Sequence, residues 1–403
     1  MRPPLLFLAH RLPYPPNKGD KIRSFHLLKQ LASDYRVFLG AFVDTPEDMQ
    51  HAGALRDLCE EVMVLRLRPR WARLASLRGL LQRQPLTVPY YWRRQLAAWV
   101  GRTIAERGIE RALVFSSSVA PYLLGPRHAG LRRVIDFVDV DSDKWAQYAE
   151  TTSLAVRWIY RREAVRLLAL ERRIAAEFDG SVFVSAAEAA LFRKLAPESA
   201  GKVSFAYNGV DTVYFDPQLP LPTPYAEGEC PLVFTGAMDY WPNVDAVCWF
   251  AEHILPSVRR AAPDAVFYAV GARPAPAVQR LARLPGVRVT GQVADVRPFL
   301  RHAAAVVAPL RIARGIQNKV LEGMAMARPS VVTPAALEGI AAISGEELLV
   351  AADASSFADA VVTVVSGRAA PGIGAAGRRR VLADFDWDRN LTGFHQLLEG
   401  GRT

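Results

Sequence analysis

The chain has 403 residues and a formal net charge of +10, with 51% hydrophobic and 22% charged residues. This length exceeds what one ordinary hydrophobic core serves, so two domains are expected. The composition is that of a globular protein and excludes a disordered or fibrous chain. The cysteines Cys59, Cys230 and Cys248 form no CxxC pair, which indicates a reducing compartment and argues against structural zinc.

No segment is typical of a membrane-spanning helix or a secretion signal. The apolar run at residues 5–9 is short and ends at His10 and Arg11. Later apolar runs are interrupted by arginine well before about 20 residues. We therefore expect a cytoplasmic protein.

Positive charge is concentrated in one segment. Residues 62–105 contain no Asp or Glu, and aromatic residues are interleaved with arginines at positions 66, 68, 70, 73, 78, 83, 93, 94 and 102. The segment is either a solvated basic face or a surface through which residues 66–102 contact an anionic membrane or a lipid phosphate. No nucleic-acid-binding motif accompanies the charge, so we expect no nucleic-acid partner.

The first half of the chain alternates between apolar runs and helical patterns. This alternation predicts an α/β domain with a parallel sheet. The predicted strands lie at residues 5–9, 36–43, 62–67, 112–115, 134–138 and 181–184. A long amphipathic surface helix is predicted over residues 157–178.

Residues 216–224 contain four prolines in nine residues, which predicts an extended linker. Strands are then predicted at residues 232–235, 265–270, 287–290 and 304–308. Three of them end in glycine, at positions 236, 271 and 291. Such glycines either close tight turns or let a ligand approach the carboxyl edge of a sheet. We expect a first domain over residues 1–215, a second over residues 228–385, and a terminal helix at 386–403 that packs on the first domain.

The most informative segment is residues 314–333, which predicts a glycine-containing loop, a short helix and a strand after Pro329. Asn318 suits the N-cap position, and a helix N-terminus attracts phosphate. Lys319 adds a cation there, and Glu322 follows on the same side of the first turn. A carboxylate at this place could accept hydrogen bonds from ribose hydroxyls. The alternative is an ordinary surface pair between Lys319 and Glu322.

With these features in view, the chain resembles the retaining glycosyltransferases of family 4, and most closely the PEP-CTERM/exopolysaccharide-associated sugar transferases. The resemblance spans nearly the whole sequence. It is carried by residues 15–23, 136–145, 183–185, 208–211, 234–239 and 318–322, with Arg328-Pro329. It implies the GT-B fold, in which two Rossmann-like doubly wound parallel-sheet domains face a central cleft.

The resemblance also implies a donor site and a reaction. The donor would be a nucleotide-diphosphate sugar, the acceptor a glycan or polyprenyl-linked molecule, and the anomeric configuration would be retained, with no metal or further cofactor. The implied donor-binding residues are Gly236, Gly315, Gln317, Asn318, Lys319 and Glu322. Lys319 would stabilise negative charge on the leaving phosphate.

The chain departs from the family pattern in two places. The first of two glutamates spaced along the donor site is replaced by Arg314, which could meet an acidic sugar or a phosphate instead. Residues 238–243 hold no Arg or Lys, although the family often has a basic residue soon after this strand. Lys319 would therefore neutralise more of the diphosphate by itself.

Two clusters in the first half are candidates for acceptor or phosphate binding. The loop residues Asn17, Lys18 and Gly19, with Arg23 one turn later, either form a functional loop or an ordinary turn before a capped helix. Asp136, Asp139, Asp141 and Asp143 crowd the end of a strand. They could bind a metal, perform acid–base chemistry or cap the next helix. Because the resemblance implies no metal, we expect Asp139 or Asp141 near the reacting hydroxyl. His10 is a weaker candidate.

Two other functions compete with sugar transfer in exopolysaccharide biosynthesis. A sugar-nucleotide epimerase can have the same fold, and a non-catalytic membrane-associated nucleotide-binding scaffold would explain the missing glutamate. A NAD-dependent enzyme is disfavoured because no GxGxxG follows the first strand.

Overall fold

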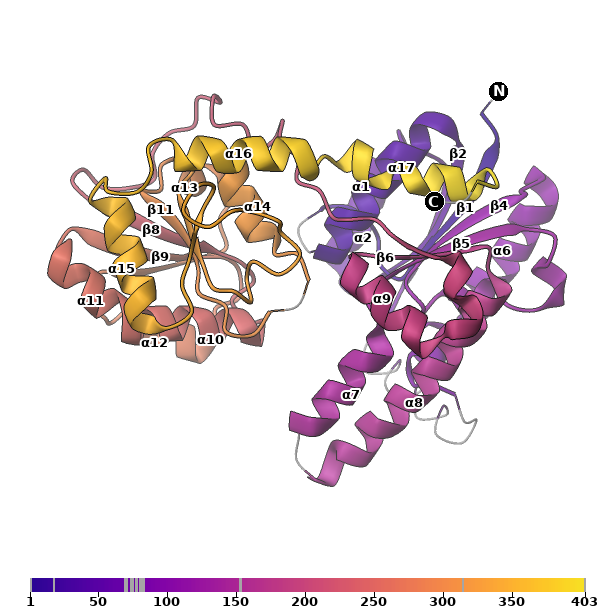
Figure 1. Cartoon of the computed structure of the whole chain (residues 1–403). Coiled ribbons are helices and arrows are strands. Elements are labelled where there is room, and N and C mark those ends of the chain that lie inside the picture. The colour runs from indigo at the N-terminus through magenta and orange to yellow at the C-terminus, as the bar shows by residue number, and fades with distance from the viewer. Residues whose placement is uncertain are drawn as a thin grey trace. The chain divides into compact units, whose positions relative to one another are not determined.

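The computed structural model describes residues 2–16, 19–68, 72, 76, 79, 84–151, 154–313 and 315–401. The chain divides into two compact units (Figure 1), which comprise residues 1–207 with 390–403 and residues 208–389. Each unit contains one parallel β-sheet, of seven and six strands. The expected α/β architecture of two Rossmann-like domains is confirmed.

The first unit is built on a parallel sheet with the strand order β3-β2-β1-β4-β5-β6-β7. Its strands are β1 (Pro4–Ala9), β2 (Arg36–Val43), β3 (Cys59–Arg66), β4 (Arg111–Phe115), β5 (Arg132–Val138), β6 (Gly180–Phe183) and β7 (Val203–Phe205). Residues Leu5 to Ala9 are all fully buried, as expected for a parallel strand covered by helices on both faces. The six strands predicted here are confirmed, whereas the three-residue strand β7 was missed.

Helices connect these strands. They are α1 (Gly19–Asp34), α2 (Pro46–Gln50), α5 (Thr87–Tyr91), α6 (Arg94–Arg107), α7 (Asp141–Thr151), α8 (Leu154–Glu177) and α9 (Ala186–Leu195). The long helix predicted over residues 157–178 is α8. It pairs with α7, and Figure 1 shows both helices extending beyond the sheet of this unit.

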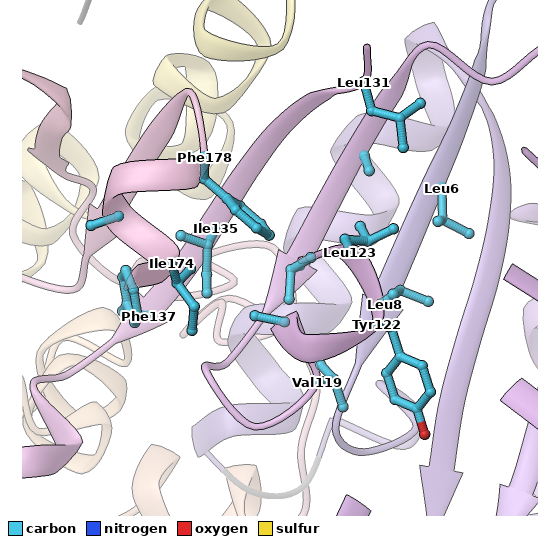
Figure 2. Packing of buried hydrophobic residues seen from close by; sticks show 14 of the residues in the cluster. Leu6, Leu8, Val119, Tyr122, Leu123, Leu131, Ile135, Phe137, Ile174 and Phe178 are labelled. Carbon is cyan, nitrogen blue, oxygen red and sulfur yellow. The ribbon is translucent and has the colours of Figure 1, made fainter. Parts of the chain in front are cut away.

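The core of the first unit joins residues from distant parts of the sequence (Figure 2). Leu6 and Leu8 of β1 and Ile135 of β5 belong to one buried cluster with Ile174 of α8 and with Phe178, which directly follows this helix. Tyr122 closes the cluster near the Arg-rich segment, and its hydroxyl donates a hydrogen bond of 2.7 Å to the Tyr91 carbonyl.

The aromatic residues of the Arg-rich segment take part in this packing. Trp99 is buried, and its indole N–H donates to Glu61 at 2.6 Å. Trp92 stacks on Tyr122 with ring centroids 4.7 Å apart. Arg70, Trp71, Arg73, Arg78 and Arg83 lie outside the described residues. In the described part of the segment, the aromatic residues Trp99 and Trp92 pack within the first unit.

The second unit has the strand order β10-β9-β8-β11-β12-β13. Its strands are β8 (Cys230–Thr235), β9 (Ala265–Val270), β10 (Val287–Gly291), β11 (Ala305–Ala308), β12 (Ser330–Val332) and β13 (Leu349–Val350). Its helices are α10 (Trp241–Trp249), α11 (Leu255–Ala261), α12 (Pro276–Leu281), α13 (Arg297–Arg301), α14 (Asn318–Ala325), α15 (Ala354–Val365) and α16 (Ile373–Asp384), with a π-helical turn at Phe250–Ile254. All strands except the two-residue β13 were predicted.

The proline-rich stretch at residues 216–224 belongs to the second unit, and the division between units lies eight residues before the boundary expected after residue 215. The stretch is anchored at both ends. Arg378 of α16 lies 3.5 Å from the Asp216 carboxylate, and the Tyr225 hydroxyl donates to the Phe299 carbonyl at 2.6 Å. These contacts attach the stretch to the second unit, although the prolines had predicted an extended linker.

The last helix, α17 (Trp387–Leu398), begins in the second unit and continues in the first. In the first unit, Glu399 after this helix accepts a hydrogen bond of 2.6 Å from the Tyr35 hydroxyl. Leu397 lies against Gly180 at the start of β6, where a Cβ atom would approach it to 3.1 Å. The C-terminal residues 390–401 are therefore integrated into the first unit.

Candidate active site

In the second sheet, the chain leaves the neighbouring strands β8 and β11 in opposite directions. β8 connects to β9 on one side and β11 connects to β12 on the other. Such a switch point opens a crevice beyond the carboxyl ends of the strands. Gly236 follows β8 at this point, and the segment from Pro309 to the start of α14 follows β11. The topology therefore brings Gly236 and the first turn of α14 to one place.

Helix α14 begins at Asn318, but its N-cap is Gln317 rather than the expected Asn318. The Gln317 side chain makes no capping bond and instead donates to the Gly315 carbonyl at 3.0 Å. Gly315 has φ of +66°, which a residue with a side chain rarely adopts. The loop therefore turns just before the helix and leaves the Asn318 side chain inside the first turn. Arg314 lies outside the described residues.

The Asn318 side chain is an unsatisfied acceptor. Its Oδ1 atom is buried and accepts no hydrogen bond from the described residues. Buried polar atoms are normally paired, so an acceptor left open at a helix N-terminus fits a site that a ligand completes.

Lys319 is held by two residues of the β8–α10 region. Its Nζ atom donates a hydrogen bond of 2.6 Å to Asn243 Oδ1 and lies 4.4 Å from the centroid of the Phe234 ring. Asn243 is itself 5% exposed and donates to the Ala237 carbonyl at 2.9 Å. Burial lowers the pKa of Lys319 to about 7, although the Glu322 carboxylate acts in the opposite direction.

Glu322 lies one turn further along α14 and is half-buried. Burial raises its pKa to about 7, and Lys319 opposes this shift. Two groups that titrate near neutral pH therefore lie together at the start of one helix. Both shifts are caused mainly by burial, so Lys319 and Glu322 are not an ordinary solvent-exposed surface pair.

Because Gly236 has no side chain, it leaves room for the Asn243 and Lys319 side chains. A Cβ atom at this position would lie 2.7 Å from Asn243 Nδ2 and 3.4 Å from Lys319 Nζ. Gly271, at the end of β9, has a different role, because its Cβ atom would lie 1.7 Å from the Gly236 carbonyl oxygen. Gly236 thus lies beside the lysine, and Gly271 allows the two strand ends to pack backbone against backbone.

The first sheet has its own switch point between β1 and β4, and polar residues gather there too. His10 follows β1, stacks on Phe115 at the end of β4, and lies 3.3 Å from the Asp20 carboxylate. Burial would raise the pKa of Asp20, but hydrogen bonds and charges from His10 and Arg11 hold it well below its usual range. Asp20 is therefore an ionised partner for His10.

Asp139 and Asp141 follow β5 and share one cation. Lys144 Nζ lies 2.6 Å from Asp139 and 3.6 Å from Asp141. Burial would lower the pKa of Lys144, but the two carboxylates raise it above its usual range. Val138, just before Asp139, has φ of +69°, which is a rare conformation for a β-branched residue and is typical of functional sites.

Arg23 and Asp136 are not available to a ligand. They are 1% and 0% exposed and form a salt bridge of 2.7 Å, and Arg23 also donates to the Ala206 carbonyl at 2.8 Å. This position favours a structural role for Arg23 instead of the expected phosphate contact. Gly19 is the first residue of α1, whereas Asn17 and Lys18 lie outside the described residues.

Among the described residues, no group of three or more His, Cys, Asp or Glu side chains is placed to hold a metal ion. None of the helices in the described ranges is both long enough and apolar enough to cross a membrane.

Comparison with known protein families gives a match for most of the second unit. Residues 229–366 match the family described as "Glycosyl transferases group 1". This part of the chain is a glycosyltransferase group 1 domain. The match contains β8, Gly236, Asn243 and the start of α14, and the protein is accordingly an enzyme of the glycosyltransferase class. No curated protein matches the sequence.

Solved glycosyltransferase structures share the fold over the whole chain. Alr3699/HepE of Anabaena, in complex with UDP and glucose, has 15% identity, covers 99% of this chain and 100% of its own, and gives a TM-score of 0.67. Sucrose-phosphate synthase from Thermosynechococcus elongatus has 18% identity, 99% and 98% coverage and a TM-score of 0.69. WaaG, a glycosyltransferase involved in lipopolysaccharide biosynthesis, has 16% identity, 98% and 100% coverage and a TM-score of 0.66.

Sequence reasoning did not identify several residues of this glycosyltransferase that surround the expected ones. Asn243 and Phe234 hold Lys319 in the second unit, and Lys144 bridges Asp139 and Asp141 in the first. Only Lys144 had a local signal, because a lysine three residues after Asp141 on a helix can reach it. Asn243 lies 76 residues from Lys319, so no local spacing could have joined them.

Proposed function

We propose that the protein transfers a sugar from a nucleotide-diphosphate sugar to a glycan or polyprenyl-linked acceptor. The observation that carries this proposal is the part-buried hydrogen bond between Lys319 and Asn243 within the glycosyltransferase domain. It holds one cation at the first turn of α14, where backbone N–H groups lack helical partners and attract phosphate.

The proposed donor site comprises the residues expected from the sequence: Gly236, Gly315, Gln317, Asn318, Lys319 and Glu322. The diphosphate would lie against the helix start and Lys319. The open Oδ1 of Asn318 and the Glu322 carboxylate would accept hydrogen bonds from ribose hydroxyls. As the glycosidic bond breaks, negative charge grows on the leaving phosphate, and the preplaced ammonium of Lys319 would stabilise it.

The finer features of the proposal rest on resemblance. We infer a family 4 enzyme that retains anomeric configuration and acts in exopolysaccharide biosynthesis, in the cytoplasm. Residues 66–102 would contact an anionic membrane that carries the acceptor. Asp139 or Asp141 would lie near the acceptor hydroxyl, and no metal would be required. Because HepE was solved with UDP and with glucose, UDP-glucose is the first donor to try.

The test is a product assay with UDP-, GDP-, ADP- and dTDP-sugars, each with and without short glycan and polyprenyl-phosphate acceptors. Transfer of the sugar, or slow donor hydrolysis, supports the proposal. Conversion of the donor to another sugar nucleotide without any acceptor would instead identify an epimerase. Nucleotide binding in a thermal-shift screen without transfer, hydrolysis or donor conversion would instead indicate the nucleotide-binding scaffold. Absence of nucleotide binding would contradict all three functions.

A further inference from the structure

The described residues of the proposed donor site carry too little positive charge for a diphosphate. Lys319 is one cation, and the carboxylate of Glu322 lies close enough to influence its pKa. The diphosphate of a nucleotide sugar brings about two negative charges that cannot be buried without compensation. A second cation at the same crevice is therefore expected, and the loops beyond the carboxyl ends of the strands are where it would lie.

Among the described residues, three arginines lie in or next to these loops, and each of the three is paired with an aspartate. Arg273 pairs with Asp239, Arg297 with Asp295, and Arg311 with Asp245. The pairs differ in their place along the sheet. Only the first joins the loops that follow β8 and β9, the loops that begin with Gly236 and Gly271.

The loop that carries Arg273 is packed directly on the loop that borders Lys319. The backbone N–H of Met238 donates to the Ala272 carbonyl at 2.9 Å, and that of Ala275 donates to the Met238 carbonyl at 3.0 Å. Gly271 lies against the Gly236 carbonyl, and Gly236 in turn borders Lys319 Nζ. The loop that carries Arg273 is thus held next to the loop that borders Lys319. The contacts that hold it are made by backbone atoms and do not depend on the flexible Arg273 side chain.

Arg273 also has an unusual backbone. Its φ is +52°, in the left-handed region that residues with side chains seldom occupy. Such conformations persist where the surroundings impose them, and they cluster at ligand-binding sites. The side chain that this backbone presents is 57% exposed, and its guanidinium makes two hydrogen bonds to Asp239, of 2.6 and 3.2 Å.

We propose that Arg273 is the second cation of the donor-diphosphate site, held ready by Asp239 and transferred from that carboxylate to the phosphates when the nucleotide binds. An arginine side chain can make this exchange readily, because the planar guanidinium donates a pair of hydrogen bonds to a phosphate as well as to a carboxylate. In the free protein, Asp239 positions the Arg273 side chain. When the nucleotide binds, the Asp239 carboxylate competes with the phosphates for the guanidinium. This inference rests on the proposed function, since it concerns the same nucleotide.

The experiment measures binding of UDP, GDP, ADP and UMP to the full chain by calorimetry. For the nucleoside diphosphate that binds best, Arg273→Ala should weaken binding about tenfold, and Arg273→Lys should weaken it less. Asp239→Ala should strengthen binding, because it removes the competing carboxylate. If UDP is the best binder, the loss in Arg273→Ala should be larger for UDP than for UMP. Arg379→Ala, on the exposed face of α16, is the matched control and should change nothing.

Nucleotide affinity is expected to fall in Arg273→Ala and to rise in Asp239→Ala. Damage to the fold would lower the affinity of both variants, so the two results separate ligand contact from misfolding. If Asp239→Ala weakens binding as Arg273→Ala does, the pair is only structural and the inference is overturned. Unchanged affinity in Arg273→Ala overturns it as well, while wild-type binding leaves the proposed function standing. If the wild-type chain binds none of the nucleotides, the proposed function fails and this inference falls with it.

Discussion

Lys319 and Asn243 lie 76 residues apart in the sequence and are joined by a hydrogen bond of 2.6 Å between α14 and α10. The bond fixes the ammonium over the Phe234 ring, where burial has already removed much of its water. An ammonium prepared in this way needs little rearrangement when an anionic group arrives.

Replacement of Lys319 by alanine should therefore impair sugar transfer without unfolding the protein. We expect turnover to fall at least about tenfold, which corresponds to ~1.4 kcal/mol of activation free energy. Steady-state kinetics measures the effect, and a thermal melt checks the fold. Lys194→Ala, at an exposed position of α9, should keep normal turnover. Near-normal turnover in Lys319→Ala would remove this residue from the mechanism.

Donor binding should depend on pH through Lys319. Its pKa in the free protein is lowered to about 7 by burial, whereas a bound diphosphate would raise it by charge attraction. Binding above about pH 7 therefore requires proton uptake, and affinity should fall by up to about tenfold per pH unit in that range. Calorimetry in buffers with different ionisation heats counts the protons. Lys319→Ala should lose this dependence, and an unchanged affinity from pH 7 to 9 in the wild type would contradict it.

Gly236 should not tolerate a side chain. In Gly236→Ala the new Cβ atom would lie 2.7 Å from Asn243 Nδ2, an atom already bonded to the Ala237 carbonyl. Asn243 must then shift and release Lys319, so donor affinity should fall by about tenfold, as for loss of one charge-assisted hydrogen bond. Gly101→Ala is the control, because its Cβ atom would meet nothing within 4 Å. Equal donor affinity in the two variants would show that Gly236 merely closes a turn.

The Arg23–Asp136 pair should matter for stability. Asp136→Asn would remove the carboxylate charge that lies 2.7 Å from the buried Arg23 guanidinium, at a cost of about 3–5 kcal/mol in the free energy of unfolding. Denaturant titration of the variant measures the loss. Arg172→Ala, which breaks the exposed pair with Glu198, should have little effect. A similar small loss in both variants would show that the buried pair contributes no more than the exposed one.

Much of the architecture could be predicted from the sequence because it rests on local patterns. Apolar runs such as residues 5–9 and 265–270 define strands buried on both faces, and their alternation with helices requires parallel sheets. The edge strands β7 and β13 have three and two residues, too few for any periodicity to show. Lys319 and Glu322 stood out because their spacing places them on one side of a helix turn.

Tertiary structure alone decided what these residues touch. Asn243 became the partner of Lys319, Arg273 was brought beside Asp239, and Arg23 was drawn into the core by Asp136. Each of these contacts joins parts of the chain that belong to different strands or follow them, and the strand order that makes them neighbours is a property of the assembled sheet. The sequence by itself thus determined the elements and the residue types at their ends, whereas packing decided which charges were paired, buried or left open to a ligand, because burial and charge pairing depend on neighbours that local spacing does not specify.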